Sequence, residues 1–392
     1  MSSGEAVSSR PSVLVVAGET SGDRIAALTV RGLARSLGAP VASYGLGGEA
    51  CGAAGVELVG EASGTAVMGF GDVAGRVPSI VRSVGRIALR ARCDPPRAAL
   101  LVSFTELSTH LGRWLRGLGV RVLWCVAPQV WAWRSGRLRT LPRSLDRLAV
   151  ILPFEEALWR RAGVDARYVG HPSLEAPRLP RAALRAELGL NGAGAIAVLP
   201  GSRAGEVLRL AEPLCGAAAL LRDRGFAESA QMLLAPSLDP AARSHAEGVA
   251  SRYRMRSIPT DREHGAASLL NAFDLALCAS GTASLEAALA GVPAVVAYRL
   301  DPLSAALARR LVRAPFMALP NILLNRRAIP ELFQGDATAP SIARAAEGVL
   351  ALPASEAPAI AEELRAILRP PSNEPFGDRV ASLMEDWLRA PK

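Results

Sequence analysis

Short apolar runs alternate with helical stretches along the whole chain, and this alternation limits the possible folds more than any other feature. Residues 13–17 form such a run, which stops at Gly18, and a helical pattern follows over residues 23–37. Repetition of a strand, a turn and a helix is typical of parallel sheets, because successive parallel strands need a crossover connection. The sequence therefore predicts an α/β fold with doubly wound parallel sheets.

The alternation falls into two halves. Gly170-His171-Pro172 and a stretch rich in Pro and Arg separate them, and the chain is too long for one ordinary core. We therefore predict a first domain at residues 1–172 and a second at 173–392, each Rossmann-like, with parallel sheets facing a central cleft. The last helical segment would cross back to the first lobe or to a partner chain. Strands are predicted at 98–104, 121–126 and 148–152, then at 195–199, 231–234, 256–258, 275–278 and 294–298.

The charge of the chain comes almost wholly from arginine. The formal net charge is +9, and the only lysine is Lys392. Because the guanidinium group matches the geometry of phosphate oxygens, we expect an anionic partner. Nucleic acid is not expected, since no helix-turn-helix, zinc-finger or RNA-binding signature accompanies the charge. A phosphorylated small molecule or an anionic lipid therefore remains as the expected anionic partner.

The chain is expected to lie in the cytoplasm and to touch a membrane only peripherally. Its five cysteines show no pairing pattern, its N-terminus lacks the features of a secretory signal, and no apolar run is long enough to span a bilayer. Residues 73–92 mix apolar side chains with arginines that include Arg76, Arg82 and Arg86. Such a helix suits an anionic membrane surface. The alternative is a solvated helix packed on the sheet.

A turn of small residues follows the first predicted strand. It contains Gly18, Ser21, Gly22 and Asp23, and Glu19 lies within it. Backbone N–H groups at such a turn can face a ligand's negative charge. The alternative is a tight turn in which Asp23 caps a helix. The glycine-rich stretch 45–50 is too weak a pattern to indicate a dinucleotide site.

Two similar turns occur in the second half. Ser202 and Arg203 follow the strand at 195–199, and Ser280, Gly281 and Thr282 follow the strand at 275–278. Ligands bind at the carboxyl ends of strands in open α/β sheets. Backbone amides of these turns could hold a diphosphate while Glu286, one helical turn later, reaches a ribose. The alternative makes Ser280 a helix cap and Glu286 a surface residue.

No metal site or cofactor is expected. The chain has no Asp-x-Asp pair, no His pair at helical spacing and no Cys cluster, and it lacks the nucleophile elbow of hydrolases and the Walker lysine. Arg203, backbone amides and a helix dipole would then stabilise a diphosphate leaving group.

Together the motifs resemble the lipid-A-disaccharide synthase family of GT-B glycosyltransferases over nearly the whole chain. In family order they are AGETSGD (17–23), AVMGFGDV (66–73), APQVWAWRSGR (127–137), LPFE (152–155), VGHP (169–172), LPGSR (199–203), SGTASLE (280–286) and LPNILLNRRAIPELFQ (319–334). The resemblance implies transfer of 2,3-diacylglucosamine from a UDP-diacylglucosamine donor to the 6-hydroxyl of a diacylglucosamine 1-phosphate acceptor. Inversion would give the β-1,6-linked disaccharide 1-phosphate and UDP.

The resemblance also implies roles for single residues. Glu19 and its turn would face the reacting sugars, and the basic stretch after Met68 would form the membrane and acyl-chain surface on the cytosolic face of the inner membrane. A homodimer is possible. UDP would be held by Ser202, Arg203, Gly281, Thr282 and Glu286, with Asn321 and Glu331 nearby.

One residue departs from the family pattern. Where the family reads Ile-Asp-x-Pro-Asp-Phe-Asn, residues 102–108 read Val-Ser-Phe-Thr-Glu-Leu-Ser, so Ser103 replaces the carboxylate often taken as the general base. A serine hydroxyl does not accept a proton at neutral pH without a base of its own. Glu106 aligns with the second Asp and could substitute, with Glu19 and His110 as weaker candidates. A divergent or non-catalytic UDP-binding relative, or a GT-B enzyme acting on another UDP-sugar, is the alternative.

Overall fold

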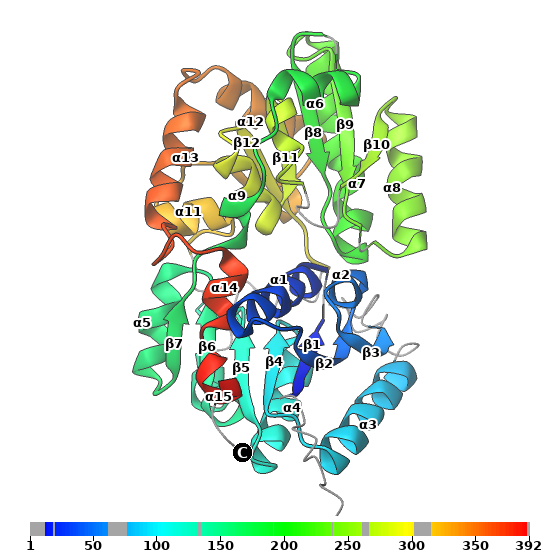
Figure 1. The fold of residues 1–392 in the computed structure, drawn as a ribbon. Coiled ribbons are helices and arrows are strands. Elements are labelled where there is room, and N and C mark those ends of the chain that lie inside the picture. The colour runs from blue at the N-terminus through cyan, green and yellow to red at the C-terminus, as the bar shows by residue number, and fades with distance from the viewer. Residues whose placement is uncertain are drawn as a thin grey trace, which may run out of the picture.

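Two parallel sheets form the two lobes of the protein (Figure 1). The computed structural model describes residues 12–18, 20–61, 77–131, 135–190, 192–236, 238–260, 266–301 and 315–389. The strand order is β3-β2-β1-β4-β5-β6-β7 in the first sheet and β10-β9-β8-β11-β12-β13 in the second. The predicted α/β fold with two parallel sheets is therefore confirmed.

The first lobe contains seven strands and the helices that connect them. The strands are β1 (Ser12–Ala17), β2 (Ala42–Gly47), β3 (Glu57–Glu61), β4 (Ala98–Val102), β5 (Arg121–Cys125), β6 (Arg147–Val150) and β7 (Asp165–Tyr168). The α-helices are α1 (Thr20–Leu37), α2 (Glu49–Ala53), α3 (Val77–Cys93), α4 (Thr105–Gly117) and α5 (Pro153–Arg161). Short 3-10 helices are η1 (Ser135–Arg139), η2 (Leu141–Ser144) and η3 (Pro172–Glu175).

The second lobe contains the other strands. The chain ends in four helices, of which the last two, α14 and α15, lie on the first lobe. The strands are β8 (Ala195–Leu199), β9 (Ser229–Leu234), β10 (Arg256–Pro259), β11 (Leu275–Ala279), β12 (Ala294–Tyr298) and β13 (Glu331–Phe333). The helices are α6 (Arg181–Leu188), α7 (Ala204–Asp223), α8 (Pro240–Arg252), α9 (Thr282–Leu289), α11 (Leu319–Leu324), α12 (Ala339–Leu350), α13 (Glu356–Ile367), α14 (Phe376–Ala381) and α15 (Glu385–Arg389).

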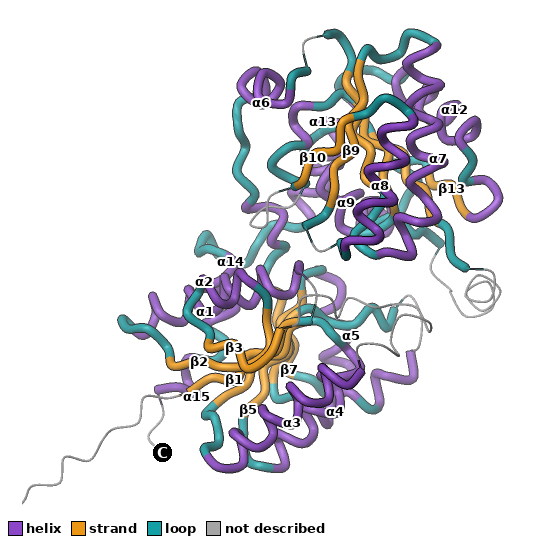
Figure 2. The backbone as a smooth tube through the Cα atoms, turned by 90° about the vertical axis from the view of Figure 1, so that its right-hand side faces the viewer, coloured by secondary structure: helices purple, strands orange, loops and turns teal. Residues whose placement is uncertain are grey.

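The central strands of each sheet are buried on both of their faces. Every residue of β4, β8 and β11 is buried, and helices cover both faces of each sheet in Figure 2. Four clusters of apolar side chains fill the spaces between sheets and helices. Burial on both faces explains why these strands read as continuous apolar runs in the sequence rather than as alternating ones.

The last two helices lie on the first lobe, although they follow the second lobe in sequence (Figure 1). Helix α14 crosses α1 so closely that a Cβ added to Gly32 would lie 2.5 Å from the Gly377 carbonyl oxygen. A Cβ added to Gly377 would lie 2.2 Å from the Leu28 carbonyl oxygen. Only glycine at both positions permits this crossing.

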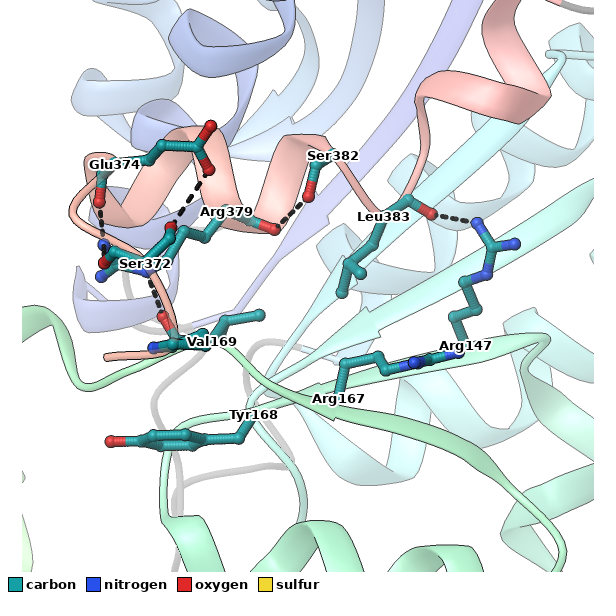
Figure 3. Close-up of a pocket in the computed structure, with 10 residues that line it drawn as sticks. Arg147, Arg167, Tyr168, Val169, Ser372, Glu374, Arg379, Ser382 and Leu383 are labelled. Carbon is teal, nitrogen blue, oxygen red and sulfur yellow. Dashed lines mark hydrogen bonds between the residues drawn. The ribbon is translucent and has the colours of Figure 1, made fainter. Parts of the chain in front are cut away.

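Arg379 ties α14 to the segment that joins the lobes. Its side chain is 5% exposed. It donates to the Val169 carbonyl at 2.7 Å, to the Glu175 carboxylate at 2.8 Å and to the Glu374 carbonyl. Figure 3 shows Arg379 pointing from α14 toward Val169 at the edge of a cavity of about 240 Å³. None of the site residues predicted from the sequence lines this cavity.

We expect replacement of Arg379 by methionine to lower the free energy of unfolding by about 3–5 kcal/mol, since it leaves buried acceptors without their donor. Chemical denaturation would measure this loss. The control is Arg35→Met, which removes a more exposed ion pair to Asp378 in the same interface and should cost less than about 1 kcal/mol. Equal losses in both variants would contradict the importance of the buried network.

Candidate functional site

The carboxyl end of β4 carries an unusual turn. Ser103 has φ 55° and Phe104 has φ 50°, in the left-handed region that residues other than glycine rarely adopt. The turn is fixed by a hydrogen bond from the Ser103 N–H to the Cys125 carbonyl at 3.1 Å. Such backbone strain is found preferentially at functional sites. The residue that departs from the family pattern therefore lies in a strained turn at the sheet edge where ligands bind.

The predicted turn after β1 lies against this strained turn. A Cβ added to Gly18 would lie 2.5 Å from the Phe104 Cβ, and one added to Gly22 would lie 3.7 Å from the Ser103 Cβ. The structure thus brings Gly18 and Gly22 together with Ser103. Ser21 is exposed in the first turn of α1. Glu19 lies outside the described residues.

Asp23 has a structural role within this turn. Its carboxylate accepts hydrogen bonds from the backbone N–H groups of Gly48 at 2.7 Å, Ala50 at 3.0 Å and Cys51 at 3.1 Å. Asp23 therefore caps α2 from outside that helix, where a carboxylate is favoured by the helix dipole. The glycine-rich stretch at 45–50 forms the end of β2 and the start of α2.

Glu106 lies in the first turn of α4, just after the strained turn. Its side chain is 72% exposed and pairs with Arg137, which is 20% exposed. His110 follows one helical turn later and is also exposed. Glu106 is thus placed near the carboxyl end of β4, three residues after Ser103.

The two predicted turns of the second lobe are neighbours. Strands β8 and β11 pair directly, with Leu199 opposite Cys278, so the segments that follow them leave the same edge of the sheet. Gly201 has φ 116°, and a Cβ there would lie 2.5 Å from a Glu206 oxygen. The carboxylate of Glu206 accepts from the Ser202 N–H at 3.2 Å and from Arg203 at 3.3 Å. Glu206 therefore shapes this turn.

The turn after β11 also needs glycine. Gly281 has φ 136°, and Thr282 begins α9, so backbone N–H groups at the start of this helix lie at the sheet edge. The Ser284 hydroxyl donates to the Gly281 carbonyl at 2.7 Å, and the Ser280 hydroxyl donates to the Met317 carbonyl at 2.9 Å. Glu286 is buried one turn later in α9, not on the surface.

Asn321 and Glu331 hold the segments on either side of α11. The Asn321 amide donates to the Ile329 carbonyl at 2.8 Å, and its oxygen accepts from the N–H groups of Ala328 and Ile329. Glu331 accepts from the N–H groups of Met317 and Ala318 at 3.0 and 2.6 Å. Because Ser280 also contacts Met317, these residues together fix one wall beside the turn at 280–282. In this structure both side chains therefore organise the protein's own backbone.

The carboxyl ends of the first sheet face the second lobe. Leu152 follows β6 and belongs to the same apolar cluster as Leu285 of α9, and Trp131, which follows β5, packs against this cluster. Helix α9 itself begins at the carboxyl end of β11. The turns of the two lobes therefore lie on facing sides of the junction between them.

Glu155 is a buried carboxylate in this junction that the sequence did not single out as a separate residue. It is 1% exposed and accepts from the Trp131 indole N–H at 3.1 Å and from the Leu152 N–H at 3.3 Å. Burial raises the pKa of Glu155 to about 8. The only sequence signal was its place in the motif LPFE.

Glu155 should make the protein less stable as the pH rises. With its pKa raised by burial, the folded chain keeps a proton that the unfolded chain releases, so unfolding is favoured progressively between about pH 4.5 and 8. We expect Glu155→Gln to gain stability relative to the native protein over this range, by at most about 1.4 kcal/mol per pH unit. Chemical denaturation at several pH values measures the difference. If the free energies of unfolding of the variant and of the native protein changed with pH in parallel, the expected effect of Glu155 would be contradicted.

Helix α3 forms an outer edge of the first lobe (Figure 2). Val81 and Leu89 are exposed on it, and Arg82 and Arg86 belong to the same helix. Met68 and Arg76 lie outside the described residues. Among the described residues, no helix combines the length and the apolar composition that a membrane span requires, and no group of His, Cys, Asp and Glu is arranged to hold a metal ion.

Solved structures of low sequence identity share the fold. A putative UDP-N-acetylglucosamine 2-epimerase from Listeria monocytogenes superimposes with a TM-score of 0.62 at 13% identity, covering 98% of this chain and 99% of that chain. Anabaena Alr3699/HepE in complex with UDP and glucose gives 0.55 at 12% identity, covering 97% and 100%. These likenesses support the predicted GT-B fold.

Sequence comparison is more specific. The family model described as Lipid-A-disaccharide synthetase matches residues 13–364. A lipid-A-disaccharide synthase of Myxococcus xanthus is 40% identical over 85% of this chain and 86% of its own length. One from an Anaeromyxobacter species is 40% identical over 92% and 94%. The chain therefore belongs to the lipid-A-disaccharide synthetase family and is a glycosyltransferase of lipid A biosynthesis.

Proposed function

We propose that the chain transfers 2,3-diacylglucosamine from UDP to the 6-hydroxyl of 2,3-diacylglucosamine 1-phosphate, with inversion at the anomeric carbon. The observation that supports this most is the pair of adjacent turns at 200–203 and 280–282, which face the first lobe and carry one guanidinium and several backbone N–H groups. Anionic groups bind well at such positions.

In this proposal the second lobe binds the donor. Arg203 and the N–H groups at Gly281 and Thr282 contact the diphosphate, and Glu286 reaches the ribose. The positive electrostatic potential of Arg203 and of these N–H groups stabilises the negative charge that develops on UDP as the bond between the anomeric carbon and the diphosphate oxygen breaks. Ser202, Glu206 and Ser280 keep the two turns in place.

The first lobe binds the acceptor. Glu106 takes the proton from the 6-hydroxyl as its oxygen attacks the anomeric carbon from the face opposite UDP, which inverts the configuration. The electron pair of the broken bond leaves with UDP. Ser103 has no charge to accept this proton, so the role falls to the carboxylate three residues later in the chain.

Turnover with defined substrates tests the proposal. Purified protein incubated with UDP-2,3-diacylglucosamine and 2,3-diacylglucosamine 1-phosphate should release UDP and yield a disaccharide 1-phosphate of the summed mass. Anomeric NMR should show a β linkage. Absence of product across the pH range would refute the proposed reaction, and an α linkage would refute inversion alone.

Helix α3 is proposed to place the protein on the cytosolic face of the inner membrane. Val81 and Leu89 expose apolar surface, while Arg82 and Arg86 supply charge for anionic lipids. We expect Val81→Asp with Leu89→Asp to weaken co-sedimentation with anionic vesicles at least about tenfold, because each change removes apolar contact and adds repulsion. The control is the exposed pair Leu179→Asp and Leu352→Asp on the second lobe. Equal losses in both double variants would contradict a role for α3.

A further inference from the structure

Arg137 forms an ion pair that the reaction as described does not use. It lies in η1, within the motif at 127–137, and its guanidinium contacts the carboxylate of Glu106. Glu106 is mostly exposed, whereas Arg137 is mostly buried. The arginine is thus the more firmly held partner, and it presents its guanidinium at the carboxyl end of β4.

The segment that carries Arg137 is fixed on both sides. At its start, Trp131 packs edge-on against Phe154, with ring centroids 5.4 Å apart, and donates to the buried Glu155. At its end, Leu141 is buried in the core of the first lobe. Arg137 therefore lies in a short 3-10 helix with an anchored residue on either side of it in the chain.

We propose that Arg137 recognises the phosphate monoester of the acceptor, and that this phosphate replaces the Glu106 carboxylate on the guanidinium. The inference rests on the proposed function, because that function gives the first lobe an acceptor with a phosphate. It adds the residue that selects the phosphate and a step that takes the Arg137 guanidinium away from Glu106 only when the acceptor is bound.

The exchange is favourable for a physical reason. An ion pair with one exposed carboxylate contributes little free energy, since water solvates both charges and the long side chain of Glu106 loses freedom. A phosphate monoester carries up to two negative charges and accepts two parallel N–H bonds from a guanidinium. Once the Arg137 guanidinium has turned to the phosphate, the Glu106 carboxylate no longer shares this cation and lies beside the bound acceptor, where it can accept the hydroxyl proton.

Calorimetric titration with glucosamine 1-phosphate tests the exchange. Arg137→Gln should weaken binding about 10- to 100-fold, the usual effect of losing a charge-assisted bidentate contact. Glu106→Gln should instead tighten binding, by up to about fivefold, because it removes the competing carboxylate. Weaker binding in both variants would mean that the pair only supports the structure, and it would overturn the inference.

Kinetics separate this inference from the proposed function. Arg137→Gln should raise KM for the diacylated 1-phosphate acceptor and leave KM for the UDP donor unchanged, with Arg139→Gln in the same 3-10 helix as the control. Native-like KM and affinity in Arg137→Gln, with normal turnover of the native protein, would overturn the inference alone. Arg137-dependent binding without any transfer would overturn the function alone, and neither binding nor transfer would overturn both.

Discussion

The Glu106→Gln variant should lose about 10²–10⁴-fold in kcat, because an amide cannot accept the proton of the attacking hydroxyl. Affinity for UDP should stay within about twofold of the native value, since Glu106 belongs to the first lobe and the donor to the second. Steady-state rates of UDP release, together with calorimetry of UDP, measure both quantities. Equal losses of turnover and donor affinity would contradict the role of Glu106 as the base.

Two further variants make this result specific. Glu57→Gln removes another exposed, arginine-paired carboxylate of the first lobe, at the amino end of β3, and should leave kcat unchanged. Ser103→Asp restores the family's carboxylate in a left-handed conformation that Asp tolerates better than most residues. If Glu106 is the base, Ser103→Asp should change the native rate little and should rescue part of the loss in Glu106→Gln. A large gain from Ser103→Asp alone would instead indicate a protein whose catalytic base has been lost.

The Arg203→Ala variant should lose about 10²–10³-fold in kcat/KM, as expected for removal of one group that stabilises developing negative charge. UDP affinity should fall as well, because the same guanidinium contacts the diphosphate of the ground state. Rates of UDP release and calorimetry distinguish the two contributions.

The matched control is Arg224→Ala, which removes an arginine just beyond the other end of α7, where it pairs with Glu347. It should leave both kcat/KM and UDP affinity near native. Native-like behaviour of Arg203→Ala would mean that the donor site lies elsewhere.

The sequence predicted the central strands of both sheets and the edge strand β10, but it missed β2, β3, β7 and β13. Strands such as β4 and β8 are buried on both faces, and their continuous apolar runs make them recognisable. β2 was not predicted, because Gly45 and Gly47 within it indicate a turn. Its Gly45 is needed for packing, since a Cβ there would lie 1.8 Å from the Val15 carbonyl oxygen.

The turns of the site were predictable, but the side chains that organise them were not. Gly201, Gly281 and the strand ends before them are local signals that a sequence displays directly. Glu206 and Glu155 act through contacts that depend on the folded turn, as does Arg137, whose partner lies 31 residues away in the chain. The family resemblance places Asn321 near the donor, and the hydrogen bonds that its amide oxygen accepts from the backbone at 328–329 could not be predicted from the sequence either.

Hydrogen exchange of the native protein with and without saturating UDP tests the central claim most directly. The account predicts slower exchange of the backbone amides at 200–206 and 280–286 and a measurable heat of binding. The exchange rates of amides at the amino ends of the strands in both sheets should not change. Unchanged exchange in both turns at a UDP concentration that saturates the protein, or protection confined to the first lobe, would contradict it.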